Sequence, residues 1–150
     1  MGTWSDFLAA DHELAAAAHT LLFQYGPGLG YLATVRADGG PRIHPVSPVI
    51  VDGGLFCFLL DSPKRRDLER DGRYALHSYP PEHSDDEVCL TGIAAPVADS
   101  GRTTRIAGAA RAAPEVDWRL FELKIGVAVV VHRPYSTTTT APVSRQIWRG

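Results

Sequence analysis

The stretch Leu29–Leu60, LGYLATVRADGGPRIHPVSPVIVDGGLFCFLL, alternates short apolar runs with tight-turn residues. Its hydrophobic period is close to two, which is typical of β-strands. Asp38-Gly39 predicts a type I′ hairpin turn, and Asp52-Gly53-Gly54 predicts a second tight turn. We expect the strands that these turns join at Leu29–Arg36, Arg42–Val51 and Leu55–Leu60. The stretch therefore predicts an antiparallel meander.

The flanking sequence adds helices and further strands. Apolar residues at helical spacing predict one helix from Ser5 to Tyr25, capped by Thr3 or Ser5. A short helix should begin after Ser62, with Pro63 as its first residue. Another helix is expected at Ser100–Ala112, and further strands at Arg73–Tyr79, Glu87–Val97, Ile125–His132 and Val143–Trp148, with weak alternation at Trp118–Leu123. Six or seven antiparallel strands with a few helices favour a barrel or a sandwich, built as one domain over residues 1–150.

The overall charge limits the range of partners. The chain has 150 residues, with 15 basic and 17 acidic side chains and a net charge of −2. A nucleic-acid binder or a protein bound to anionic membranes usually carries a basic excess, so we expect neither partner. No secretory signal and no apolar run of membrane-spanning length is visible, which predicts a cytoplasmic protein. Cys57 and Cys89 lie in apolar runs and are expected to be reduced core thiols.

The first candidate site is the motif Ser62-Pro-Lys-Arg-Arg66 at the start of the short helix. The N-terminus of a helix carries a partial positive charge, so each uncompensated cation there costs about 0.3–1 kcal/mol. A bound anion would remove this conflict, because the hydroxyl, the free N–H groups and the cationic side chains would converge on it. The alternative is a solvated basic turn, offset by the acidic Asp67, Glu69 and Asp71.

The second candidate site is the strand Arg42-Ile-His-Pro-Val-Ser47. Strand parity places Arg42, His44 and Val46 on one face, and Ile43, Pro45 and Ser47 on the other. Proline cannot donate to a sheet ladder, so one side of this strand should be unpaired and open to a planar ligand. The alternative is an edge strand that its prolines protect from aggregation.

The histidines do not form a metal-binding pattern. None of the six is paired at the spacing of a metal site, so we expect no metal centre. His44 is the one weak candidate for a catalytic residue or a haem ligand. Hydrolase and Rossmann motifs are also absent from the sequence.

The order of these motifs resembles the pyridoxamine 5′-phosphate oxidase-like FMN-binding split barrels, including the F420-dependent reductases of actinobacteria. The resemblance is carried by Leu29–Gly39, Pro41–Ser47, Ser62–Leu68 followed by Asp71–Leu76, and Glu87–Gly92. It implies a mainly β fold with a few helices, a six- to seven-stranded antiparallel split β-barrel. It also implies a homodimer that holds the cofactor between two subunits.

The resemblance implies a role for each matching residue. Ser62 and Lys64 would hold the cofactor phosphate, and Arg65 or Arg66 would replace an arginine that the family often has at Pro63. Leu60 occupies a position where the family often has a hydroxyl facing the ring, and Glu87 one where some members have a glutamine near the flavin. The strand would line the cofactor through Arg42, Ile43, His44, Pro45, Val46 and Ser47, with Arg42 on the phosphate.

Several functions remain open at this point. The first is an FMN-dependent oxidoreductase acting on a small molecule, in which the cofactor carries the hydride chemistry. The alternatives are an F420-dependent reductase, a non-catalytic flavin- or haem-binding protein, and a barrel that acts only through protein contacts. The C-terminal segment Val143–Gly150 lacks the Arg-x-His substrate clamp of the true oxidase, so vitamin B6 oxidation is not expected.

Overall fold

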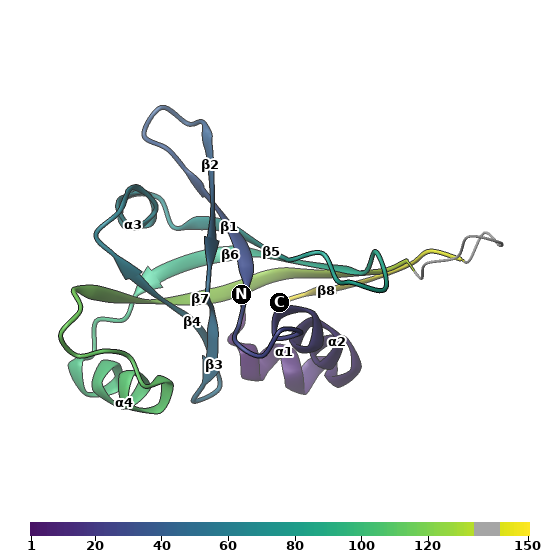
Figure 1. The fold of residues 1–150 in the computed structure, drawn as a ribbon, viewed down its shortest axis with the longest axis horizontal. Coiled ribbons are helices and arrows are strands. Elements are labelled where there is room, and N and C mark those ends of the chain that lie inside the picture. The colour runs from purple at the N-terminus through teal and green to yellow at the C-terminus, as the bar shows by residue number, and fades with distance from the viewer. Residues whose placement is uncertain (134–141) are drawn as a thin grey trace.

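The computed structural model describes residues 1–133 and 142–150. Within these ranges the chain forms a curled antiparallel sheet with helices against it (Figure 1). The helices are α1 (Trp4–Ala10), α2 (His12–Leu22), α3 (Pro63–Arg70) and α4 (Ser100–Ala110). The strands are β1 (Gly30–Val35), β2 (Pro41–Val46), β3 (Val49–Val51), β4 (Gly54–Leu60), β5 (Arg73–Ser78), β6 (Glu87–Pro96), β7 (Trp118–His132) and β8 (Ser144–Arg149).

The sheet curls because its two outermost strands are consecutive in the chain. The strand order is β2-β1-β5-β6-β7-β4-β3, and β8 pairs with the second half of β7. Ser47 and Pro48 join β2 directly to β3, so the two ends of the sheet are held together. Gly28 packs against this junction, since a Cβ there would lie 2.0 Å from the Pro48 carbonyl oxygen. The result is the predicted mainly β, antiparallel half-barrel.

The number of strands differs from the prediction of six or seven. The expected strand Arg42–Val51 is divided into β2 and β3, because Pro48 lies between them and cannot donate to a ladder. The predicted strand Ile125–His132 and the weakly alternating segment Trp118–Leu123 form one strand, the 15-residue β7. Eight strands result in the described part of the chain.

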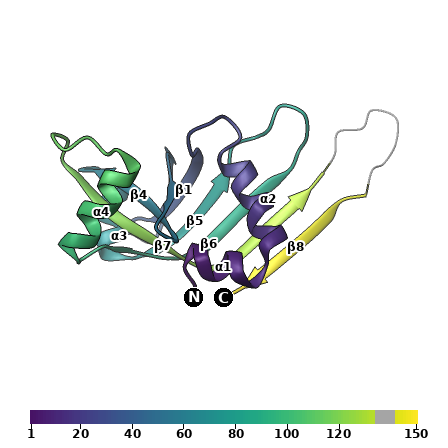
Figure 2. The same ribbon diagram turned by 90° about the horizontal axis from the view of Figure 1, so that it is seen from below.

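The prediction of one long N-terminal helix is wrong. Helix α1 ends at Ala10, and the carboxylate of the next residue, Asp11, caps α2 by accepting a hydrogen bond of 3.0 Å from the Leu14 N–H. Thr3 caps α1, with its hydroxyl bonded to the Asp6 N–H and the Asp6 carboxylate bonded to the Thr3 N–H. Both helices lie across one face of the strands β5 to β8 (Figure 2).

The turn type predicted for the first hairpin is wrong, and the second predicted tight turn is confirmed. At the first hairpin only Gly39 has a positive φ, of 85°, whereas a type I′ turn needs two such residues. The carboxylate of Asp38 instead accepts a hydrogen bond from the Gly40 N–H at 2.9 Å. Asp52 and Gly53 both have positive φ, 48° and 71°, so the two-residue turn between β3 and β4 meets the type I′ requirement of two positive φ angles.

The sheet has one buried face and one open face. Leu32, Leu76, Leu90 and Ala128 are fully buried beneath α1 and α2. The residues next to them in sequence point the opposite way, and none of the described helices covers them. We call this surface the open face; it is built from the paired rows Ile43, Ala33, Ala75, Thr91, Val127, Arg149 and Pro45, Tyr31, His77, Cys89, Val129, Ile147.

Candidate functional site

The start of α3 follows the sequence prediction. Ser62 is the N-cap, with an extended backbone and a side-chain oxygen that accepts a hydrogen bond from the Arg65 N–H at 3.4 Å. Its hydroxyl donates to the Leu60 carbonyl oxygen at 2.9 Å. Pro63 is the first helical residue, where its missing N–H costs nothing. These contacts fix the direction in which the first turn of α3 points.

The three cations of this turn are compensated unequally. Arg65 pairs with Glu69 at 3.3 Å and lies 4.0 Å from Asp117, and Arg66 pairs with Asp61 at 2.7 Å. Among the residues that the structure describes, no carboxylate forms an ion pair with Lys64. Of the acidic residues that follow directly in sequence, only Glu69 offsets a cation of this turn, because Asp67 pairs with Arg42 and Arg70, and Asp71 pairs with Arg73. Lys64 is left without an ion-pair partner among the described residues.

Lys64 lines a cleft of about 350 Å³ between the end of β2, the end of β4 and the start of α3. The other lining residues are Pro45, Val46, Ser47, Cys57, Phe58, Leu59, Leu60, Asp61 and Ser62. Segments from three parts of the chain thus meet at one place. They include six of the predicted cofactor-binding residues, namely Pro45, Val46, Ser47, Leu60, Ser62 and Lys64.

The two ends of this cleft differ in chemistry. One end has the Lys64 ammonium and the Lys64 backbone N–H, the one N–H of the first turn of α3 that has no acceptor among the described residues, and this pair suits an anion; the Asp61 carboxylate lines the same cleft. The other end is apolar, with Phe58 held edge-on against Trp118 at 4.9 Å between ring centroids. Burial raises the pKa of Cys57 to about 12, which keeps its sulfur a thiol and not a nucleophilic thiolate at neutral pH. The arrangement fits a planar ring with an anionic tail.

The remaining predicted residues of β2 lie outside this cleft. Ile43 is 64% exposed on the open face. His44 points to the other side of the strand, where its Nδ1 is buried with no hydrogen-bond partner among the described residues. The Nε of Arg42 donates to the buried Asp67 at 2.7 Å. The strand parity predicted for these residues is confirmed by their burial pattern.

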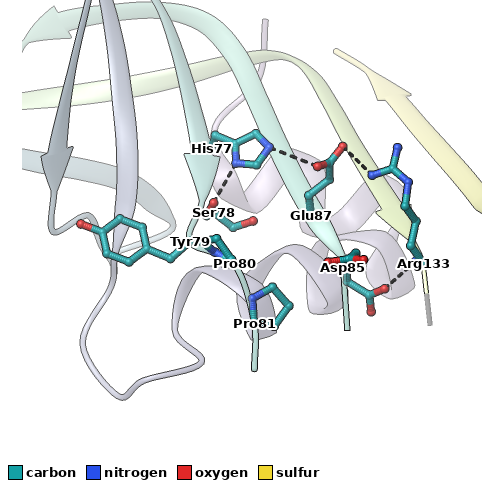
Figure 3. A pocket seen from close by; sticks show the side chains of 9 residues that line it. His77, Ser78, Tyr79, Pro80, Pro81, Asp85, Glu87 and Arg133 are labelled. Atoms are coloured by element: carbon teal, nitrogen blue, oxygen red, sulfur yellow. Dashed lines mark hydrogen bonds and ion pairs between the residues drawn. The ribbon is translucent and has the colours of Figure 1, made fainter. Parts of the chain in front are cut away.

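Arg65 and Glu87 are also not part of the cleft lining. The guanidinium of Arg65 is directed to Glu69 and Asp117, as described above. Glu87 lies at the start of β6 in a second pocket of about 320 Å³ (Figure 3). That pocket is lined by His77, Ser78, Tyr79, Pro80, Pro81, Asp85, Asp86, Glu87 and Arg133.

His77 is the residue of this second pocket that the sequence analysis missed. Its Nδ1 lies 2.7 Å from the Ser78 carbonyl oxygen, which can only accept, so Nδ1 carries a proton and donates. Its Nε2 faces the Glu87 carboxylate at 3.6 Å, and Glu87 also pairs with Arg133 at 3.2 Å (Figure 3). Only the register of β5 against β6, with His77 opposite Cys89, brings these side chains together.

The described residues contain neither a metal-binding cluster nor a membrane-spanning helix. No group of three or more His, Cys, Asp or Glu side chains gathers in them as a metal site. No helix among them is long and apolar enough to span a bilayer. The cytoplasmic location stays a prediction.

Comparison with known proteins identifies the fold. No family model and no curated protein sequence matches the chain. Among solved structures, it is similar to a haem-binding protein from Mycobacterium smegmatis, with a TM-score of 0.61 and 19% identity over 87% of this chain. The chain is a split β-barrel. It spans only 57% of that mycobacterial protein.

Two further structures share this split-barrel fold over more of their own length. HutZ, the haem storage protein from Vibrio cholerae, has a TM-score of 0.54 and 17% identity, covering 77% of this chain and 89% of HutZ. A NimC/NimA family protein from Clostridium acetobutylicum has a TM-score of 0.61 and 15% identity, covering 90% of this chain and 94% of that protein. At such identities the likeness concerns the fold alone.

Proposed function

We propose that this split barrel is a cofactor-binding protein that holds a planar cofactor with an anionic tail, of the FMN class, in the cleft at the start of α3. The observation that carries the proposal is the state of Lys64. It lines the cleft at a helix N-terminus, where a cation is unfavourable, and no carboxylate among the described residues compensates it. A phosphate would supply the missing negative charge.

The form of the cleft favours a monophosphate. Lysine binds phosphate as a point charge, and the Lys64 backbone N–H at the start of α3 adds one unpaired donor. The apolar wall at Phe58 and Leu59 is suited to a ring. FMN, when bound, would supply hydride-transfer chemistry. F420 shares the phosphate and the tricyclic ring, and is the alternative occupant.

We propose binding rather than turnover as the main activity. The cleft lining has no histidine, and Cys57 stays protonated. His44, the weak candidate for a catalytic residue, is not among the lining residues. Haem-binding and haem-storage proteins with this fold support a role in holding a cofactor.

The test is a titration of the purified full chain with FMN, F420 and haemin, followed by fluorescence or absorbance. Lys64→Ala should weaken FMN binding by about 10- to 100-fold, the equivalent of a charge-assisted hydrogen bond. Lys124→Ala removes the only other lysine, on β7 and outside the cleft, and should leave FMN affinity unchanged. Equal loss in both variants, or none in Lys64→Ala, would place the phosphate elsewhere. Steady reduction of a substrate with a nicotinamide or F420 donor would contradict a binding-only role.

Haem is the second candidate, and His77 is the observation that favours it. Because Nδ1 donates to a backbone carbonyl, Nε2 is the nitrogen left to bind a ligand in the second pocket, where haem would have to displace the Glu87 carboxylate that faces it at 3.6 Å. An imidazole oriented in this way can ligate haem iron, and Arg133 lies beside it as a cation for a haem carboxylate. In this case His77→Ala should abolish haemin binding and its Soret shift, whereas Lys64→Ala should leave both unchanged.

A further inference from the structure

Pro63 borders a third concavity, of about 440 Å³, that the proposed cofactor site does not use. Its walls come from the β1–β2 hairpin and from α3. Four arginines and two aspartates line it, together with Ala37 and Pro63; the charged residues are Arg36, Asp38, Arg42, Arg66, Asp67 and Arg70. Such an excess of guanidinium groups in a hollow indicates an anion as ligand.

Asp67 accepts hydrogen bonds from two of these arginines, Arg42 and Arg70, and so orients them. It is only 2% exposed, and it accepts hydrogen bonds from the Arg42 Nε at 2.7 Å, the Arg70 NH2 at 3.2 Å and the Thr34 hydroxyl at 2.8 Å. One carboxylate thus holds two guanidinium groups, which leaves a net positive charge between them. A guanidinium has five N–H donors, so both arginines keep donors that Asp67 does not use.

Arg36 and Arg66 are the other two arginines that line this concavity. Their side chains are 50% and 58% exposed, and their ion-pair partners, Asp38 and Asp61, are exposed as well. Asp61 does not line the concavity, so the charge of Arg66 is not cancelled inside it. Exposed pairs of this kind contribute little to stability, and an incoming anion can replace their carboxylates.

We propose that this concavity is a second anion site, which binds a chain of successive phosphate or carboxylate groups. Its cations lie on two different elements around a hollow, whereas a single phosphate is held by one or two such groups. The opposing interpretation gives the arginines a purely structural role, with Asp67 fastening α3 to the hairpin. That role accounts for Arg42 and Arg70, and it leaves Arg36 and Arg66 without a function.

The experiment titrates the full chain with sodium tripolyphosphate and with tetraglutamate by calorimetry at constant ionic strength. Arg36→Gln and Arg66→Gln should each weaken binding of the preferred probe by about tenfold, since each removes a charged donor. Arg105→Gln is the matched control, because Arg105 is also an exposed arginine paired with an exposed aspartate, Asp52. It should bind the probe like the unaltered chain.

The same variants distinguish this site from the cofactor cleft. Lys64→Ala should weaken FMN and leave tripolyphosphate binding unchanged, and Arg66→Gln should do the reverse. The tighter of the two probes identifies the natural ligand as an oligophosphate or an oligocarboxylate. Absence of saturable binding of both probes, or equal losses in Arg66→Gln and Arg105→Gln, would overturn the proposal. Failure of FMN alone would affect only the proposed cofactor site.

Discussion

Asp67 is the buried carboxylate that joins α3 to the β1–β2 hairpin. Burial opposes its ionisation, but hydrogen bonds from Arg42, Thr34 and Arg70 outweigh this effect and hold its pKa below the ordinary value. A buried group with three donors leaves those donors unpaired if it is removed, which is costly. Asp67 therefore contributes to stability as an anion, and its contribution depends on pH.

Asp67→Asn should lower the free energy of unfolding by about 2–3 kcal/mol at pH 7, because Arg42 and Arg70 lose a charged partner. A lowered folded-state pKa means that the stabilisation is present above the unfolded value of 3.8 and is lost as the pH falls through the folded value. The difference between the unaltered chain and Asp67→Asn should thus shrink between pH 5 and acid pH. Urea denaturation across this range measures it. A difference that stays constant down to acid pH would show that the charge of Asp67 does not matter.

The two cysteines differ in burial and should differ in reactivity. Cys57 is 1% exposed, whereas Cys89 is half-buried on the open face, and burial raises the pKa of both thiols. A native-state thiol reagent at pH 8 should therefore label Cys89 of the monomer slowly and Cys57 hardly at all, and the predicted homodimer, which covers the open face, should protect Cys89 as well. Both should react in denaturant. Cys89→Ser should remove the native labelling; labelling that persists in this variant would mean that Cys57 is accessible.

At the level of single residues, the sequence located the charge conflict of Ser62–Arg66 but could not say which cation carries it. The partner of Arg65 was visible, since Glu69 follows at the i, i+4 spacing of a helix. Whether Lys64 has an ion-pair partner depends on how the ends of β2 and β4 are placed around it in the fold. His77 was missed for a similar reason, because its neighbour Glu87 lies on another strand.

The elements show a comparable division between local and non-local signals. Helix α3 was predictable, because Ser62 and Pro63 specify its start by themselves. The break between α1 and α2 also has a local signal in Asp11, a favoured N-cap residue, which the continuous apolar pattern concealed. The sheet order was not predictable, since β2 and β3 occupy opposite ends of it although they are consecutive in the chain.

The turn between β3 and β4 is an element that a single methyl group should disrupt. Gly53 has a φ of 71°, and a Cβ there would lie 2.4 Å from the Ser5 Oγ. Gly53→Ala should therefore lower the free energy of unfolding by about 2 kcal/mol, through backbone strain and a clash with α1. Thermal or urea denaturation measures the loss.

Gly39→Ala separates these two causes. Gly39 has a φ of 85°, and nothing lies within 4 Å of the position of its Cβ, so only strain of about 1 kcal/mol is expected. Adding Ser5→Ala to Gly53→Ala should recover the part of the loss that comes from the clash. Equal losses in the two glycine variants would mean that the contact with Ser5 is relieved without cost.

At the scale of the whole molecule, the open face is the sheet surface that none of the described helices covers. Helices α1 and α2 bury the other side of the sheet, as both views show (Figures 1 and 2). The open face carries Ile43 and Ile147, which are 64% and 42% exposed, and the half-buried Val127 and Val129 between them. An apolar sheet surface of this kind is typical of a protein–protein interface. The predicted homodimer would pair this face with its copy.

The homodimer prediction can be tested with Ile43→Glu, which places a charge at the β2 edge of the proposed contact, where Ile43 is its most exposed apolar side chain. The unaltered chain should sediment as a dimer at micromolar concentration, and Ile43→Glu should shift it to the monomer, because a desolvated, unpaired carboxylate is strongly unfavourable in an interface. Leu8→Glu is the control, since Leu8 is also exposed but lies on α1, across the sheet from the open face. If the cofactor cleft is completed by the second subunit, Ile43→Glu should weaken FMN binding as well, although Ile43 does not line the cleft. A monomeric unaltered chain would contradict the dimer, and a monomeric Ile43→Glu with full FMN affinity would show that one subunit holds the cofactor alone.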